Sequence, residues 1–184
     1  MLGVVLAAVL SGKRSDDGNG NPAKAYDYEQ RFTVFRNVLI TKSDPSTFFD
    51  PDSPQSLALH WLVYRDRTIS LDNLDRLTQR YAIMVLYYAC GGENWRGYIT
   101  PLVEEVETNE CDLKGFNCDE FGNVASVRLN DRGMAGRLPF EIGLLSALTE
   151  LNLFANDLER AIPDSIYSLE LLSKYCQYTF CECY

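Results

Sequence analysis

Apolar residues recur at a fixed interval in the second half of the chain. The segment 124–129 has apolar residues at its first, fourth and sixth positions, the segment 148–153 repeats this pattern 24 residues later, and Leu172 opens a third round after the same interval. Further apolar positions keep this spacing, with Met134, Leu138, Ile142 and Leu145 corresponding to Leu158, Ile162, Ile166 and Leu169. A unit of this length cannot bury its apolar face alone, so the period predicts stacked units with one strand in each.

The first half of the chain shows helical spacing instead. An amphipathic helix is predicted over residues 25–40, where apolar side chains follow one another every three or four positions. Ser53-Pro54 is typical of a helix start, with serine as the cap and proline in the first turn. A third helix is expected to begin at Ser70 or Asp72 and to end at Gly91-Gly92.

These patterns predict an α+β fold and divide the chain into five parts. The parts are an apolar N-terminal segment and flexible linker (1–24), a helical block (25–92), a cap loop (93–123), two repeats with parallel strands (124–172) and a cysteine-rich end (173–184). The first repeat has no preceding neighbour, so the helical block and the cap loop are expected to cover its exposed apolar end and its strand edge.

The repeats resemble those of plant-type leucine-rich-repeat proteins, with the consensus L-x-x-L-x-L-x-x-N-x-L-x-G-x-I-P-x-x-I-G-x-L. Asn156 and Gly136 fit the asparagine and glycine positions in one repeat each, whereas Arg132 and Arg160 stand there in the other. The asparagine bonds backbone groups along the stack in that family. Because Arg132 is too large and charged for this place, we expect the first repeat to bulge or to point this side chain outward.

Two segments before the repeats extend the resemblance over about residues 50–172. Cys111 to Cys118 resembles the C-x-W-x-G-V-x-C cap loop of the plant family, with Leu113 and Phe116 in place of tryptophan and valine. The segments 53–62 and 79–89 look like the region that precedes the repeats in membrane-anchored leucine-rich-repeat proteins of diatoms. The resemblance implies a short right-handed solenoid with a parallel sheet and a receptor-like role.

Six cysteines are present, an even number that fits disulfides in an exported protein. Cys111 and Cys118 are close enough to bridge a small loop. Cys90, Cys176, Cys181 and Cys183 then allow three pairings. A zinc site at the last three would lack a fourth ligand, since the single histidine, His60, lies far away in an apolar stretch. We expect no metal and no cofactor.

The first ten residues are apolar and uncharged. They are too few to span a bilayer, which needs about 20. Two functional interpretations stay open, the core of a signal peptide or the end of a transmembrane helix, beside an apolar stub without either role. Both functional interpretations place the remainder outside the cell or at its surface, in the second case with an N-terminal membrane anchor.

The charge balance excludes some partners and ligands. The chain has 26 acidic and 17 basic residues, a formal net charge of −9, which disfavours binding to nucleic acid. Residues 102–120 carry seven carboxylates against one lysine, but their spacing matches no calcium loop, so a solvated acidic loop is expected. His60 has no partner constellation, and no motif of a reaction class occurs, so no enzyme is predicted.

The repeat pattern fails after Leu172, where Gln177 takes the sixth position of the third round. The chain is therefore either the front of a longer array or a minimal array closed by cysteines. An open strand edge at this end would favour self-association.

The positions between the leucines should form an outward-facing surface of the strands, which repeat proteins use for protein or peptide ligands. The candidate binding residues are Arg128, Asn130, Asp131, Glu150, Asn152 and Phe154. Phe154 is the best candidate for an anchor because aromatic side chains dominate interfaces. The prediction is non-catalytic protein–protein recognition; the alternatives are a degenerate array with only a structural role and, last, an enzyme.

Overall fold

The computed structural model describes residues 28–71, 73–96, 107–159, 161–177 and, for the backbone alone, 181–183. Within these ranges the N-terminal part is helical, as predicted. Its helices are α2 (Tyr28–Leu39), α3 (Pro54–Tyr64) and α4 (Leu77–Ala89), with the 3₁₀ turn η2 (Pro45–Phe49) between α2 and α3. The segments 1–24 and 25–27, with the apolar stretch at the N-terminus, lie outside the described residues. None of the described helices is long and apolar enough to cross a membrane.

The observed helix ends agree with the sequence predictions at some positions and differ at others. The Ser53 hydroxyl accepts a hydrogen bond from the Ser56 amide at 3.1 Å, and Pro54 follows it, so the predicted start of α3 is confirmed. Gly91 ends α4 in the left-handed conformation, with φ 67°. The start of α4 was predicted too early: the helix begins at Leu77, and Ser70 instead takes part in a short bridge with Asn73.

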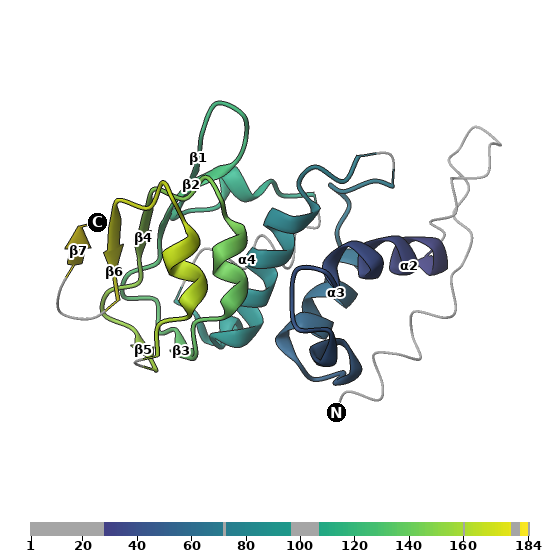
Figure 1. Cartoon of the computed structure of the whole chain (residues 1–184), viewed down its shortest axis with the longest axis horizontal. Coiled ribbons are helices and arrows are strands. Elements are labelled where there is room, and N and C mark those ends of the chain that lie inside the picture. Colours follow the sequence, from purple (N-terminus) through teal and green to yellow (C-terminus); the bar gives the residue numbers. More distant parts are fainter. Residues whose placement is uncertain (1–27, 72, 97–106, 160, 178–180, 184) are drawn as a thin grey trace.

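The strands form a five-stranded sheet in the order β1-β2-β4-β6-β7 (Figure 1). β1 (Phe116–Cys118) is antiparallel to β2 (Val124–Arg128), and β2, β4 (Glu150–Asn152) and β6 (Lys174–Cys176) run parallel. Ser126, Glu150 and Lys174 lie side by side in this register, 24 residues apart at each step. The period of the sequence is therefore the register of the parallel sheet.

The sheet continues past the point where the apolar pattern fails. Tyr175 of β6 takes the place of Leu151 and is buried, and β7 (Cys181–Cys183) folds back antiparallel onto β6. The edge that we expected to be open therefore carries two further strands. Gln177, which breaks the leucine pattern, is buried. Its side chain accepts a hydrogen bond from the Tyr175 hydroxyl and donates one to the Glu159 carbonyl at 3.0 Å, so its polar atoms have partners in the core.

A second, two-stranded sheet departs from the 24-residue spacing. β3 (Ala135–Gly136) pairs in parallel with β5 (Asp157–Leu158), and Ala135 faces Asp157, only 22 residues away. Asp131 and its equivalent Ala155, 24 residues later, both have positive φ, so the turn after the strand begins alike in the two repeats. The pairing of this small sheet is therefore shifted by two residues, although Met134 and Leu158 are both buried, as their correspondence predicts.

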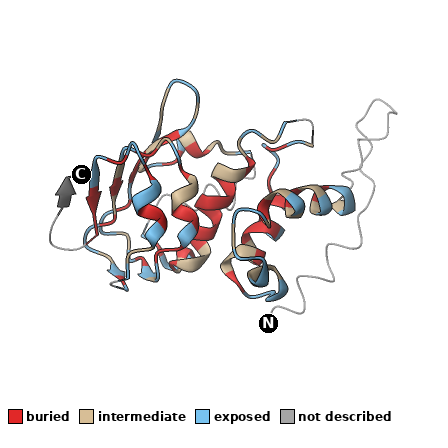
Figure 2. Cartoon of the chain, viewed as in Figure 1, coloured by how far each residue is buried: buried red, intermediate tan, exposed pale blue. Residues whose placement is uncertain are grey.

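The core lies between the main sheet and a row of helical segments, and it continues among the helices α2, α3 and α4 (Figure 2). The row consists of α4 and the 3₁₀ helices η5 (Phe140–Leu144) and η6 (Asp164–Ser168), with α4 packed on η5 and η5 on η6. α4 therefore stands where a preceding repeat would place its own helical segment, and it covers the end of the core. α3 packs on α4, and α2 packs on α3.

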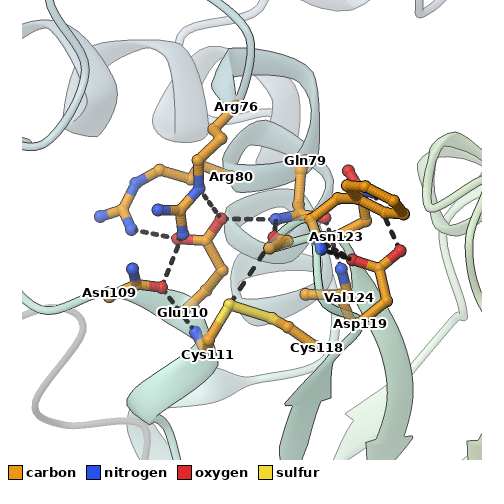
Figure 3. The surroundings of a disulfide bond; sticks show 12 residues. Arg76, Gln79, Arg80, Asn109, Glu110, Cys111, Cys118, Asp119, Asn123 and Val124 are labelled. Carbon is orange, nitrogen blue, oxygen red and sulfur yellow. Dashed lines mark hydrogen bonds and ion pairs between the residues drawn. A yellow bond between two sulfur atoms is a disulfide. The ribbon is translucent and has the colours of Figure 1, made fainter.

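A polar network joins α4 to the cap beside the disulfide (Figure 3). Cys111 and Cys118 form the predicted disulfide. The Gln79 side chain accepts from the Val124 amide at 2.7 Å and donates to the Gly122 carbonyl at 3.1 Å, so it bonds the backbone where β2 begins. It also donates to the Glu110 carboxylate at 2.6 Å. One helical side chain thus fixes α4, the cap turn η4 (Glu110–Asp112) and the first parallel strand together.

Glu110 is an exception to the expected solvated acidic loop, in which Glu107, Asp112 and Glu120 are exposed and residues 102–106 lie outside the described residues. Its side chain is fully buried and, besides Gln79, contacts Arg76 and Arg80, with Arg80 Nη1 at 2.7 Å from the carboxylate. Arg80 is itself buried and pairs with Asp66 in the loop after α3. Burial alone would raise the pKa of Glu110, but hydrogen bonds from Arg76 and Gln79 and the charge of Arg80 lower it below its usual value. The carboxylate is a connector between the helical block and the cap.

The structure narrows the pairing of the other cysteines. Cys90, at the end of α4, carries a free thiol that is fully buried and lies 3.5 Å from the Arg137 carbonyl. Burial raises the pKa of this thiol to about 12, so it stays protonated. Cys176 is disulfide-bonded. Each of the three pairings expected for these four cysteines includes Cys90, so the structure contradicts all three as complete sets. The side chains of Cys181 and Cys183 lie outside the described residues.

Candidate functional site

The candidate site is the outer face of the main sheet, on the side away from η5 and η6. Along each strand the side chains alternate, so Val127 and Leu151 point into the core while their neighbours point outward. The outward positions of β2, β4 and β6 are aligned by the parallel register, which places Arg128 beside Asn152 and Glu150 between Ser126 and Lys174. Residues far apart in the chain thus form one surface.

Glu150 is at the centre of this face. Its carboxylate forms an ion pair with Arg128 on one side and with Lys174 on the other, where Nζ lies 2.9 Å from Oε1. The Ser126 hydroxyl adds a third contact at 3.3 Å. The Glu150 side chain is only 12% exposed, whereas Arg128 is 52% and Lys174 46% exposed. The two cations therefore rise to the surface on either side of a largely covered carboxylate.

The electrostatics of the face follow from these pairs. The hydrogen bond from Arg128 is the main cause that lowers the pKa of Glu150, to about 2, and Lys174 contributes in the same direction. Glu150 is thus ionised at any physiological pH. The three side chains together carry two positive charges and one negative charge, although the whole chain is acidic.

Asn152, at the end of β4, and Phe154, in the turn that follows, continue the face. The Asn152 side chain accepts the Phe154 amide at 3.1 Å, which shapes the chain as it leaves the strand. The Phe154 side chain is 42% exposed. Asn130, exposed at the corresponding place after β2, lies next to it, since the Asp131 amide donates to the Phe154 carbonyl at 2.9 Å. An exposed aromatic residue therefore lies beside the polar residues Asn130 and Asn152 at one end of the face.

Asp131 lies slightly apart from the other candidates. Its φ is 52°, and its carboxylate lies 3.4 Å from Arg96 with both side chains largely exposed. The pair marks the border between the sheet face and the loop after α4. The structure thus brings Arg128, Glu150, Asn152 and Phe154 together and places Asn130 and Asp131 at the rim.

Lys174 is the residue of this face that the sequence analysis missed. It follows Glu150 by 24 residues, and that spacing is the signal that could have found it. We stopped the repeats at Leu172 because the leucine pattern ends there, although the outward positions of a strand do not depend on leucines.

Asn156 supports the turn below the face. Its side chain accepts the Arg132 and Met134 amides, at 2.9 and 3.1 Å, and donates to the Leu129 and Leu153 carbonyls, at 2.7 and 2.9 Å. This is the backbone-bonding role that the resemblance implied. Arg132 of the first repeat is half-buried, with Nη1 3.3 Å from the Arg96 carbonyl, so its side chain points towards the loop after α4.

Other chemistry has little support in the described part of the chain. No group of three or more His, Cys, Asp or Glu side chains there is placed to hold a metal ion. His60 is exposed on α3 and makes edge-on contacts with the rings of Phe32 and Tyr64. The sheet face therefore offers a binding surface, and His60 is part of an aromatic contact between helices.

Comparisons with known proteins agree with this class of site. No protein-family model matches the chain. The chain is 29% identical over 86 residues to the receptor-like kinase TMK2 of Arabidopsis thaliana (46% of this chain, 9% of that protein) and 39% identical over 57 residues to the receptor protein kinase WSS1 of Oryza sativa subsp. japonica (30% and 6%). It is also 27% identical over 115 residues to the probable LRR receptor-like serine/threonine-protein kinase At1g53430 of Arabidopsis thaliana (61% and 11%).

A solved chain from the crystal structure of PEPR1-AtPEP1 is similar at 23% identity and a TM-score of 0.43, over 53% of this chain and 14% of that one. The chain spans only about a tenth of the length of the curated relatives it matches. Together with the 24-residue register, the sequence likenesses support a protein of the leucine-rich-repeat type, similar to plant receptor-like kinases.

Proposed function

We propose that the chain is a non-catalytic recognition module that binds a protein or peptide segment on the outer face of its sheet. In this proposal residues 124–172 form the two repeats of a short leucine-rich-repeat solenoid, which β6 continues, residues 93–123 are its N-terminal cap, and the helical block 25–92 supports the cap. The module would act in a receptor-like protein at the cell surface. The likeness of the helical block to diatom proteins is a further prediction of the same kind.

One observation carries the proposal: the outward side chains of three parallel strands form a continuous polar surface with a half-exposed aromatic ring at its end. Arg128, Glu150 and Lys174 are held in fixed positions by their mutual ion pairs. Phe154 supplies the apolar anchor that protein interfaces commonly use. Preordered side chains lose less entropy on binding, which favours affinity even on a small face.

Side-chain hydrogen bonds between distant parts of the chain argue against a degenerate array. Gln79, Glu110 and Asn156 each satisfy several groups from different parts of the chain. A network of this kind specifies one arrangement of the strands, and a surface for recognition needs a fixed arrangement.

A peptide selection tests the proposal. The purified chain is immobilised, a library of random dodecapeptides displayed on phage is selected on it, and affinities of enriched peptides are measured by calorimetry. Phe154→Ala should weaken binding about tenfold or more. Tyr167→Ala is the matched control, because Tyr167 is an exposed aromatic (68%) on η6, on the opposite side of the core. Equal effects of both substitutions, or no enriched peptide that depends on Phe154, would refute the proposal.

A further inference from the structure

The outer face of the sheet has more positive than negative charge at its centre, and this identifies the kind of partner it fits. Both carboxylate oxygens of Glu150 are already engaged, Oε1 by Lys174 and Oε2 by Arg128 and Ser126. The Glu150 carboxylate is therefore paired with two cations, Arg128 and Lys174. The excess is one positive charge on a chain whose net charge is −9.

Arg128 and Lys174 have further N–H donors that can bind a partner. A guanidinium has five N–H donors and an ammonium has three. Within the part of the chain that the structure describes, Glu150 is the only bonded partner of the Arg128 and Lys174 side chains. About half of each side chain is exposed, so the remaining donors point to solvent on the same face as Phe154.

We propose that this face recognises an extended acidic segment of a partner protein, with an Asp or Glu side chain bound by Arg128 and Lys174 and an apolar side chain against Phe154. This inference rests on the proposed function and names the partner of the same site.

The strand geometry sets the spacing of the two anchors in the partner. Arg128 is level with Asn152, the last residue of β4, and Phe154 follows two residues later in the turn after the strand. Strands lie about 4.8 Å apart and two extended residues span at most about 6.6 Å, so the backbone positions of Arg128 and Phe154 are within about 8 Å of each other. Side chains two residues apart in an extended peptide lie on the same side at a similar distance. The recognised pattern is therefore acidic-x-apolar.

Electrostatic repulsion of basic segments makes the face specific for acidic ones. A basic segment would meet two exposed cations, while the Glu150 carboxylate is covered and already paired. Like charges placed together at an interface are strongly unfavourable, so a basic partner is rejected.

The experiment combines peptide selection with charge variants of the full 184-residue chain. The library consists of random dodecapeptides joined to the phage coat through their C-termini, so that no free terminal carboxylate is offered. The enriched sequences should contain Asp or Glu two residues from a large apolar residue. Their dissociation constants should increase with salt concentration, as electrostatic contacts are screened.

Two arginines provide a matched comparison. Arg128 pairs with Glu150 on the face, and Arg137 pairs with Glu159 away from it, at 3.0 Å with both side chains exposed. Arg128→Glu should weaken binding of an acidic peptide at least tenfold, whereas Arg137→Glu, with the same change of charge, should change it less than twofold. Arg128→Gln, checked by its melting curve, replaces Arg128→Glu if that variant does not fold.

The outcomes separate this inference from the proposed function. Peptides that depend on Phe154 but carry no acidic residue, or equal effects of the Arg128 and Arg137 substitutions, would overturn the acidic pattern and leave the proposed function standing. A face that enriches no peptide sensitive to Phe154 would overturn both.

Discussion

Replacing Glu110 by alanine should loosen the joint between the helical block and the cap. The carboxylate accepts hydrogen bonds from Arg76 Nε at 3.0 Å, Gln79 Nε2 at 2.6 Å and Arg80 Nη1 at 2.7 Å. Removing one partner of a buried ion pair costs about 3–5 kcal/mol of unfolding free energy. Arg80 keeps its pair with Asp66, and Arg76 is one-third exposed and can be hydrated, so we expect the lower value, about 3 kcal/mol.

Urea unfolding followed by tryptophan fluorescence measures this loss. Trp61 is a suitable probe, because its ring lies 5.6 Å from the Arg80 guanidinium carbon. With a slope of about 2 kcal/mol per molar urea, the midpoint should fall by about 1.5 M. Glu120→Ala, at an exposed carboxylate of the same cap, should change stability by less than about 0.5 kcal/mol.

The pH dependence gives an independent check of the same reasoning. The pKa of Glu110 is lower in the folded chain than its usual value of 4.5, so its charge stabilises the fold above that value. The advantage of the parent chain over Glu110→Gln should therefore be complete at neutral pH and shrink as the pH falls below 4.5. A loss under about 1 kcal/mol for Glu110→Ala, or a difference from Glu110→Gln that is independent of pH, would refute the account of the network.

Three further predictions concern the repeats. Asn156→Ala should cost about 2–4 kcal/mol, because it leaves backbone groups unbonded, and hydrogen exchange at the Met134 amide should accelerate. Gly136→Ala should cost at least about 2 kcal/mol in a thermal melt, since φ is 104° and the added Cβ would lie 2.6 Å from the Ala89 carbonyl oxygen. Glu150→Gln should cost about 1 kcal/mol at neutral pH, a value reduced by solvent screening, and the difference should vanish as the pH falls from 4.5 towards the pKa of Glu150, about 2.

One result would contradict each of these three predictions. Unchanged exchange at Met134 would show that Asn156 does not hold the turn of the first repeat. A neutral Gly136→Ala would show that α4 does not approach the repeats this closely. A constant effect of Glu150→Gln down to pH 2 would show that the charge of Glu150 is not what its neighbours stabilise.

Much of this fold can be predicted from the sequence, because the periodic parts depend on local and nearest-neighbour contacts. The 24-residue period predicts the register of the parallel strands, and Ser53-Pro54 predicts the start of α3. The outward positions of β2 and β4 follow from the same alternation. The resemblance to the plant consensus also implied the bonding role of Asn156.

Other features depend on contacts between distant residues and could not be read from local pattern. Glu110 belongs to an acidic stretch, and only the fold shows that Arg76, Gln79 and Arg80 meet it. The third parallel strand has Tyr175 where β4 has Leu151, and Gln177, bonded to Tyr175, takes the position that Leu153 has after β4. This is also why Lys174 was overlooked.

Hydrogen exchange of the complex with an enriched peptide tests the central claim most directly, because it locates the bound surface. The account predicts that binding slows backbone exchange in residues 126–130, 150–154 and 174–176, and leaves η5 and η6 unchanged. Protection confined to 140–144 and 164–168, with none on the strands, would contradict it.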